Sequence, residues 1–214
     1  MISALLTHMG LGLLLGFRHA FEADHLAAVA TIVSREKSPV RAGAIGACWG
    51  SGHLTSLLLI GLPVVGLGLH LPRGLDLPLE LGVAAMIVFL GVGGLTKSGS
   101  MEHRHTHSLR ELGRRPFGVG MAHGLAGSGA LTLVILATMP SRREGLFYLG
   151  SFGFGSILGM VAASAALSVP IALSGISVPM TARIARTVSL ASIVFGIFYG
   201  FSTLAQALGG HGLS

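Results

Sequence analysis

The stretch Arg18-His19-Ala20-Phe21-Glu22-Ala23-Asp24-His25 lies between two apolar runs, residues 1–17 and 26–33, and five of its eight side chains are ionisable. A charged side chain costs about 2.5 to 3.5 kcal/mol at the centre of a membrane helix, whereas a Leu or Val gains only about 0.3 to 0.6 kcal/mol. The stretch is therefore either a loop at a membrane surface or a functional site that faces protein or water.

The composition around this stretch is that of an integral membrane protein. Of 214 residues, 51% are hydrophobic and 10% are charged, and the mean hydropathy is +0.78. Apolar runs close to the roughly 17 to 25 residues that cross a bilayer recur along the chain, so helices are the predicted spanning elements. The 33 glycines suit close packing between such helices. A single cysteine, Cys48, excludes an internal disulfide and a cysteine-rich zinc site.

The apolar runs predict an all-α protein with six transmembrane helices in one transmembrane domain, residues 1–214. The first run lacks a basic leader and is interpreted as a retained span. Ten Lys and Arg residues fall on one side of this topology and three on the other, which predicts that both termini lie outside a cytoplasmic membrane. The net charge of +6 then marks cytoplasmic loops rather than a nucleic-acid partner. The predicted spans are residues 2–33, 42–69, 77–96, 116–139, 145–173 and 184–208.

A weak internal repeat relates the two halves of the chain. Laying residues 16–20 over residues 120–124 places His19 on His123. If each unit, residues 2–96 and 116–208, contains three spans, the second copy is inverted in the membrane, as in many transporters. A chance resemblance between glycine-rich helices is the alternative.

The loop at residues 97–115 carries alternating histidines, His103, His105 and His107. Such a tract is suited to weak metal collection. A solvated basic loop that happens to contain histidine is an equal alternative. On the charge count this loop is cytoplasmic, where it could receive a metal but not capture it from outside.

The opening stretch itself offers metal ligands. His19, Asp24 and His25, with Glu22 close by, supply nitrogen and oxygen atoms suited to a divalent transition metal such as Ni, Co, Zn or Fe. At about 100° per residue, a regular helix places Asp24 about 140° and His25 about 240° from His19, so they cannot converge on one ion. We therefore expect the first span to be irregular here, which is permitted where the backbone lines a polar cavity.

Other spans offer further candidates. His53 lies near the middle of the second span, and His123 lies in the fourth with Ser128 after it. A single intramembrane histidine more often bonds between helices than binds metal, but several in one small bundle indicate an ion pathway. His8 lies about 16 Å before His19 and about 20° around the helix. It is either a relay on the way in or a coincidence.

The sequence His19-x4-Asp24-His25 resembles the H-x4-D-H signature of the nickel/cobalt transporter family, and Gly52-His53 is similar to that family's glycine-histidine motif. The resemblance implies a secondary transporter for Ni²⁺ or Co²⁺, with His19, Asp24, His25 and His53 in metal recognition. Six spans rather than eight resemble the shorter urease- or hydrogenase-accessory permease branch. The family's later acidic signature is replaced here by residues 123–130, which leaves fewer carboxylates.

The leading hypothesis is thus a permease for nickel or cobalt ions, not an enzyme, with the metal as substrate and no permanently bound cofactor. The expected partners are the metal ion and the lipid bilayer, and a homo-oligomer or a metallochaperone stays open. One alternative is a six-span exporter or permease for a non-metal substrate. Another is a membrane metalloenzyme, although the chain lacks the His-Glu-x2-His zinc pattern.

Overall fold

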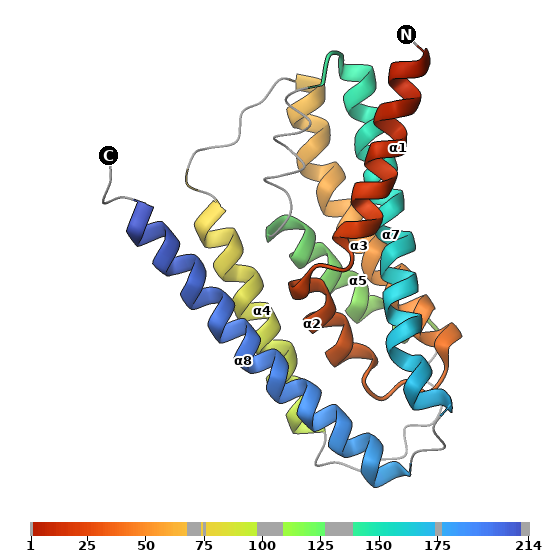
Figure 1. Ribbon diagram of the computed structural model, residues 1–214, viewed down its shortest axis with the longest axis vertical. Coiled ribbons are helices and arrows are strands. Elements are labelled where there is room, and N and C mark those ends of the chain that lie inside the picture. The colour runs from red at the N-terminus through yellow and green to blue at the C-terminus, as the bar shows by residue number, and fades with distance from the viewer. Residues whose placement is uncertain are drawn as a thin grey trace.

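The computed structural model describes residues 2–67, 74, 76–97, 109–126, 139–173 and 177–210. Every regular element within these ranges is a helix, as predicted (Figure 1). The helices are α1 (Ile2–His19), α2 (Ala23–Val33), α3 (Pro39–Leu67), α4 (Asp76–Lys97), α5 (Leu109–Ala126), α7 (Arg142–Leu173) and α8 (Val178–Gly210).

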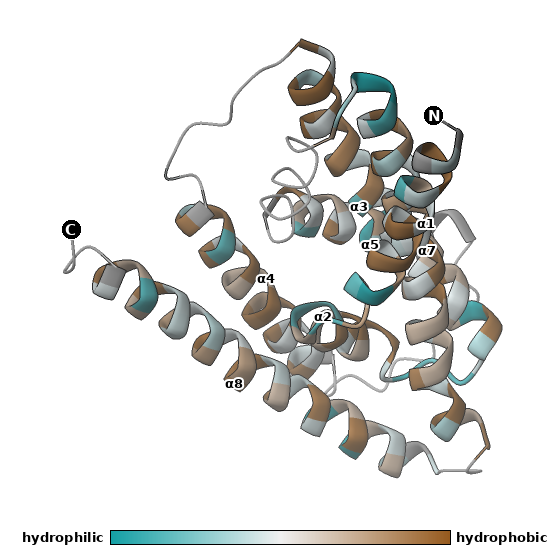
Figure 2. Cartoon of the chain, turned by 45° about the horizontal axis from the view of Figure 1, so that its top comes forward, coloured by the Kyte–Doolittle hydropathy of each residue, from teal (hydrophilic) through white to brown (hydrophobic). Residues whose placement is uncertain are grey.

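Four of these helices are long and apolar enough to cross a membrane: α3, most of α4, α7 and most of α8. Large apolar side chains are exposed on the outer faces, among them Phe89, Phe198 and Phe201. Such a surface suits lipid and not water. Figure 2 shows hydrophobic residues along most of the ribbons and hydrophilic ones gathered where α1 gives way to α2.

The helices pack in two groups that α2 joins. One group contains α1, α3, α5 and α7, with α7 between α1 and α3 and with α5 against α3. The other is the antiparallel pair of α4 and α8, which lies beside the first group in Figure 1. The short helix α2 contacts both groups, and Thr31 Oγ1 lies 2.7 Å from Ser192 Oγ of α8. The break that precedes α2 therefore lies where the two groups meet, with His19 and Ala20 buried and Phe21, Glu22 and Ala23 exposed.

The predicted irregularity between His19 and His25 is present. Helix α1 ends at His19 and α2 begins at Ala23, with Glu22 extended at φ −66° and ψ 152°. The amide groups of Phe21 and Glu22 donate to the carbonyls of Arg18 and His19 at 2.9 and 3.0 Å. The backbone at the break is thus hydrogen-bonded, which non-helical chain at membrane depth requires.

The helix boundaries refine the predicted spans in two places. Within the predicted first span, residues 2–33, the expected break divides the chain into α1 and α2. Helix α5 begins at Leu109, inside the segment predicted as a loop, so His123 lies in its last turn rather than at the start of a span. The predicted fourth span continued to residue 139, and its residues 127–138 lie outside the described part of the chain.

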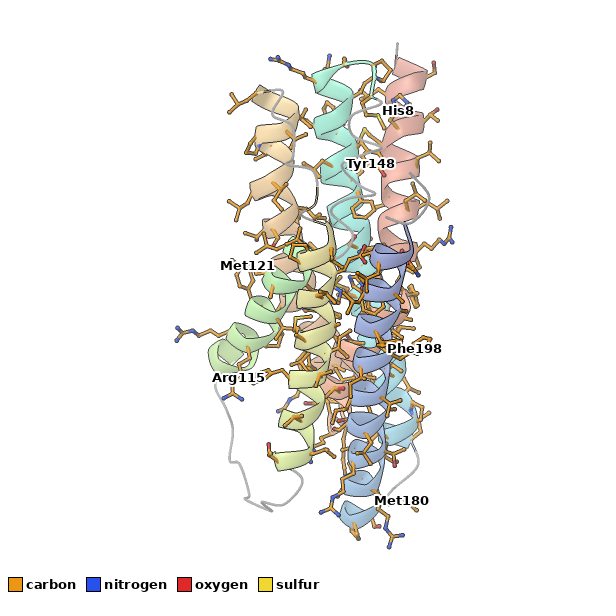
Figure 3. All side chains as sticks on the ribbon, turned by 90° about the vertical axis from the view of Figure 1, so that its left-hand side faces the viewer. His8, Arg115, Met121, Tyr148, Met180 and Phe198 are labelled. Atoms are coloured by element: carbon orange, nitrogen blue, oxygen red, sulfur yellow. The ribbon has the colours of Figure 1, made fainter. Side chains whose placement is uncertain are left out.

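Both chain ends lie toward one end of the molecule. The first turn of α1 is at the upper end in Figure 1, and the last turn of α8 lies in the upper half but well below it. Figure 3 places His8 and Tyr148 toward that end and Met180 at the opposite end. The segment from α2 to α3, with Arg35 and Lys37, lies in the lower half of Figure 1, toward the end that carries Met180, and Arg41 follows in the first turn of α3.

Candidate metal site

Four histidines meet at the break between α1 and α2. His25, His53 and His123 are completely buried, and His19 is 5% exposed. The ring centroids of His19 and His25 are 4.3 Å apart, and those of His25 and His123 are 4.0 Å apart. A regular helix would hold the first two rings on separate faces, so the break is what brings them together.

Three of these imidazoles converge on one point. One ring nitrogen from each of His19, His25 and His53 lies within 4.8 Å of the others. Nε2 of His19, Nε2 of His25 and both ring nitrogens of His53 are buried without a hydrogen-bond partner among the described residues. Buried nitrogen atoms normally find a partner, and three imidazole nitrogens this close together could hold a transition metal.

The carboxylates of the stretch hold two of these rings. Glu22 Oε2 lies 3.0 Å from His19 Nδ1, and Asp24 Oδ1 lies 3.1 Å from His25 Nδ1. An ionised carboxylate only accepts hydrogen bonds, so both Nδ1 atoms carry the proton. Both Nε2 atoms then keep a free lone pair for the metal. Carboxylates behind metal-binding histidines usually act in this way.

Asp24 is stabilised by three donors. The backbone amide of His25 donates to Oδ1 at 2.9 Å, His25 Nδ1 lies 3.1 Å from the same oxygen, and His123 Nε2 donates to Oδ2 at 3.0 Å. Asp24 also lies in the first turn of α2, where the helix dipole favours a negative charge. These interactions explain how a carboxylate is accommodated in an apolar bundle.

Close backbone contact between α3 and α5 brings His123 to the cluster. A Cβ atom on Gly52 would strike the Phe117 carbonyl, and one on Gly124 would lie 2.7 Å from the His53 carbonyl. Ser56 Oγ also donates to the Met121 carbonyl at 2.5 Å. The glycines therefore permit the approach that places the His123 ring 6.2 Å from the His53 ring.

Aromatic side chains enclose the cluster. The Trp49 ring lies 5.5 Å from His25 and 5.6 Å from His123, and the Phe152 ring lies 5.5 Å from His19. Trp49 is 1% exposed and Phe152 is 5% exposed. These side chains bury the four imidazoles in a largely apolar environment.

The remaining predicted residues are not all at this site. His8 belongs to neither group of metal-binding atoms; its Nδ1 lies 2.8 Å from Glu144 Oε2 of α7. Ser128, His103, His105 and His107 lie outside the described residues. Sequence reasoning did not find the partner of His8, because it comes from a distant helix, nor the Trp49 wall, because a lone Trp carries no local signal.

Comparison with known proteins gives three relatives. The urease accessory protein UreH of Bacillus sp. (strain TB-90) is 31% identical over 211 residues, which is 92% of each chain. The chain belongs to the UreH family. Two Arabidopsis thaliana proteins named Chloroplast protein FOR GROWTH AND FERTILITY are each 26% identical. Number 1 matches over 94% of this chain and 62% of its own length, and number 2 over 72% and 45%.

No protein-family model and no solved structure matches the chain. The family assignment therefore rests on the sequence relative, and the site in this UreH-family chain rests on its own geometry. That geometry offers buried nitrogen ligands in an apolar helical bundle, with carboxylates behind two of them.

Proposed function

We propose that this chain is a permease that carries Ni²⁺, with Co²⁺ as the alternative ion, across the cytoplasmic membrane. The observation that carries the proposal is the set of three buried imidazoles, His19, His25 and His53, whose ring nitrogens lie within 4.8 Å of one another. Neutral imidazoles suit these ions. The relative's name, urease accessory protein, and the resemblance to nickel/cobalt transporters support nickel as the substrate.

The site suits transport because it lies at a helix break and needs no energy-coupling domain. The chain contains no P-loop for ATP. A divalent ion that moves inward through 100 mV, negative inside, gains about 4.6 kcal/mol, since each charge gains about 2.3 kcal/mol. The membrane potential alone is therefore a sufficient driving force for uptake. The proposed permease also needs no permanently bound cofactor.

We infer six spans in two inverted repeats, with α1 and α2 together as the first span. Five pairs of glycine contacts support this symmetry, because exchanging the halves converts one contact of each pair into the other. The α3–α7 and α4–α8 pairs are antiparallel, whereas α1 is parallel to α7 as α5 is to α3. Between α3 and α7, the contact of Gly50 with Ile157 matches that of Gly153 with Leu54, and the contact of Gly46 with Ser164 matches that of Gly61 with Leu149. The contacts of α1 with α7 match those of α5 with α3: Gly16 with Phe152 matches Gly120 with Trp49, and Gly155 with Leu13 matches Gly52 with Phe117. Between α4 and α8, Gly91 with Ile193 matches Gly196 with Val88.

In this topology both termini are outside, and the basic end that contains Lys37 is in the cytoplasm. The segment with His103, His105 and His107 is then also cytoplasmic. There it is positioned to receive the ion after release, before a metallochaperone or the target enzyme takes it.

Nickel uptake tests the function. Cells that express the wild-type chain should accumulate radioactive nickel above cells with an empty vector, and excess Co²⁺ should compete. His19→Ala removes one converging nitrogen, so uptake should fall to the vector level. Asp24→Asn leaves the three converging imidazoles in place but weakens the ring orientation of His25, so uptake should fall at least about 10- to 100-fold.

Ser168→Ala is the control for expression and folding. Ser168 is buried on α7, and its hydroxyl bonds only within its own helix, to the Ala165 carbonyl at 2.8 Å, among the contacts given for it. This variant should retain wild-type uptake. Wild-type uptake in both site variants would contradict the assigned site, and uptake insensitive to Co²⁺ and Ni²⁺ competition would favour a non-metal substrate.

Cysteine labelling tests the topology. In a Cys48→Ser background, Lys37→Cys and Arg142→Cys each place one thiol at an exposed position, near opposite ends of the helices. A membrane-impermeant maleimide should label the Arg142 variant in intact cells and the Lys37 variant only after permeabilisation. The reverse pattern would invert the topology, and equal labelling of both in intact cells would refute an inverted pair of three-span units.

A further inference from the structure

The ring of His25 faces two different sets of ligands. Its Nδ1 lies 3.1 Å from Asp24 Oδ1, whereas its Nε2 is buried without a partner in the described part of the chain. His25 belongs to one group of possible ligands with His19 and His53 and to a second group with Asp24 and His123, and within each group the ligand atoms lie within 4.8 Å of one another. We assign Nε2 of His25 to the first group, because Nε2 of His19 and both ring nitrogens of His53 are likewise without a partner among the described residues. We assign Nδ1 to the second group, because it faces Asp24.

The two groups differ in chemistry and origin. The first is all nitrogen and comes from α1, α2 and α3. The second contains a carboxylate and adds His123 from α5. In the proposed repeats, His123 is therefore the ligand that the second half contributes. The His123–Asp24 bond of 3.0 Å crosses between the halves.

We propose that the transported ion occupies two positions in succession, which share His25 as a ligand. The first lies among His19, His25 and His53, and the second lies among Asp24, His25 and His123. This inference rests on the proposed transport function and specifies how the ion crosses the site. The first position is ready to bind an ion, because Nε2 of His19, Nε2 of His25 and both nitrogens of His53 have no partner among the described residues. At the second position, the carboxylate oxygens of Asp24 are occupied by hydrogen bonds to His25 and His123, which an ion would have to replace.

One tautomer of His25 cannot serve both positions. A neutral imidazole carries one proton and has one free nitrogen lone pair. With the ion on Nε2 the proton is on Nδ1 and faces Asp24, and with the ion on Nδ1 the proton is on Nε2. His123 likewise carries its proton on Nδ1 when Nε2 binds the ion. The two positions therefore exclude each other, and one ion alternates between them.

The order of the positions follows from their place along α3. This helix begins at the basic end, so Trp49 lies one turn nearer that end than His53. His123 packs on Trp49, whereas His19 packs on His53 and Phe152. Phe152 continues through Tyr148, at a ring distance of 6.2 Å, toward the end where His8 lies. The first position thus faces the outer end and the second the basic end.

Separate measurements of binding and transport test the two positions. The full chain is purified in detergent for nickel-binding titration and reconstituted in vesicles for nickel uptake. His53→Gln should lose binding and uptake together, each more than tenfold. His123→Gln should keep one bound nickel ion with an affinity within about threefold of wild type, and should lose uptake more than tenfold. Any binding loss in His123→Gln stays small because the first position does not contain that residue.

His123→Asn is a second variant at the same position, in case His123→Gln does not fold. The test needs only one His123 variant that has the elution profile and thermal midpoint of the wild type. Ser168→Ala is the matched control. Equal loss of binding in the His53 and His123 variants would overturn the inference in favour of a single site. Wild-type uptake by a His123 variant, or two ions bound per wild-type chain, would also overturn it. In each of these cases the wild-type chain still transports nickel. A wild-type chain that neither binds nor transports nickel would refute the proposed function itself.

Discussion

His25→Ala is expected to reduce both nickel binding and nickel uptake to background. His25 is the only described residue present in both groups of ligand atoms, and its ring lies 4.3 Å from His19 and 4.0 Å from His123. Removing the carboxylate that accepts a hydrogen bond from a metal-binding histidine typically costs about 10- to 100-fold in metal affinity. Loss of the shared ligand itself should exceed that cost, because each group keeps only two ligand atoms.

The variant is compared with Glu22→Gln and with His211→Ala in the same binding titration and uptake assay. Glu22 holds only His19, through a 3.0 Å contact, and is half exposed, so its variant should show a partial loss of no more than about 10-fold. His211→Ala, which changes a histidine near the C-terminus, should match wild type. Uptake above half the wild-type rate in His25→Ala would show that the ion does not pass through this cluster.

The helix break was predictable from the spacing of His19 and His25 together with the chemistry of the stretch. His19 and His25 lie on separate faces of a regular helix, so a shared function for both required an irregular backbone. The structure breaks the chain between them and places the rings edge to face. No glycine or proline within residues 18–25 marks the break. The signal was chemical, in the cost of five ionisable side chains within an apolar region.

The roles within the site were less predictable. Asp24 was predicted as a metal ligand, and the structure places its two oxygens on His25 Nδ1 and His123 Nε2. A sequence does not state which ring nitrogen faces a carboxylate, because that depends on the position of α5 against α3. The start of α5 was missed for a local reason. Its first turns are rich in charged residues, so no apolar run marks them.

Gly120→Ala is expected to destabilise the fold and to lose nickel uptake, whereas Gly118→Ala on the same helix should do neither. A Cβ atom on Gly120 would strike the Trp49 carbonyl and ring, whereas one on Gly118 meets nothing within 4 Å in the described structure. Overpacking of a close contact typically costs about 1 to 3 kcal/mol. Because Gly120 lies in the same helix face as His123, the displacement of α5 should also move that ring away from Asp24.

Thermal midpoints of the two purified variants separate packing from helix propensity. Alanine is about 1 kcal/mol better than glycine within a helix, so Gly118→Ala should match or slightly exceed the wild-type midpoint. For a chain of this size each 1 kcal/mol shifts the midpoint by roughly 2 to 4 °C. Gly120→Ala should therefore melt lower by about 2 to 12 °C. Equal midpoints for both variants would mean that α3 and α5 are not in backbone contact at Trp49, and the position of His123 in the cluster would then lose its support.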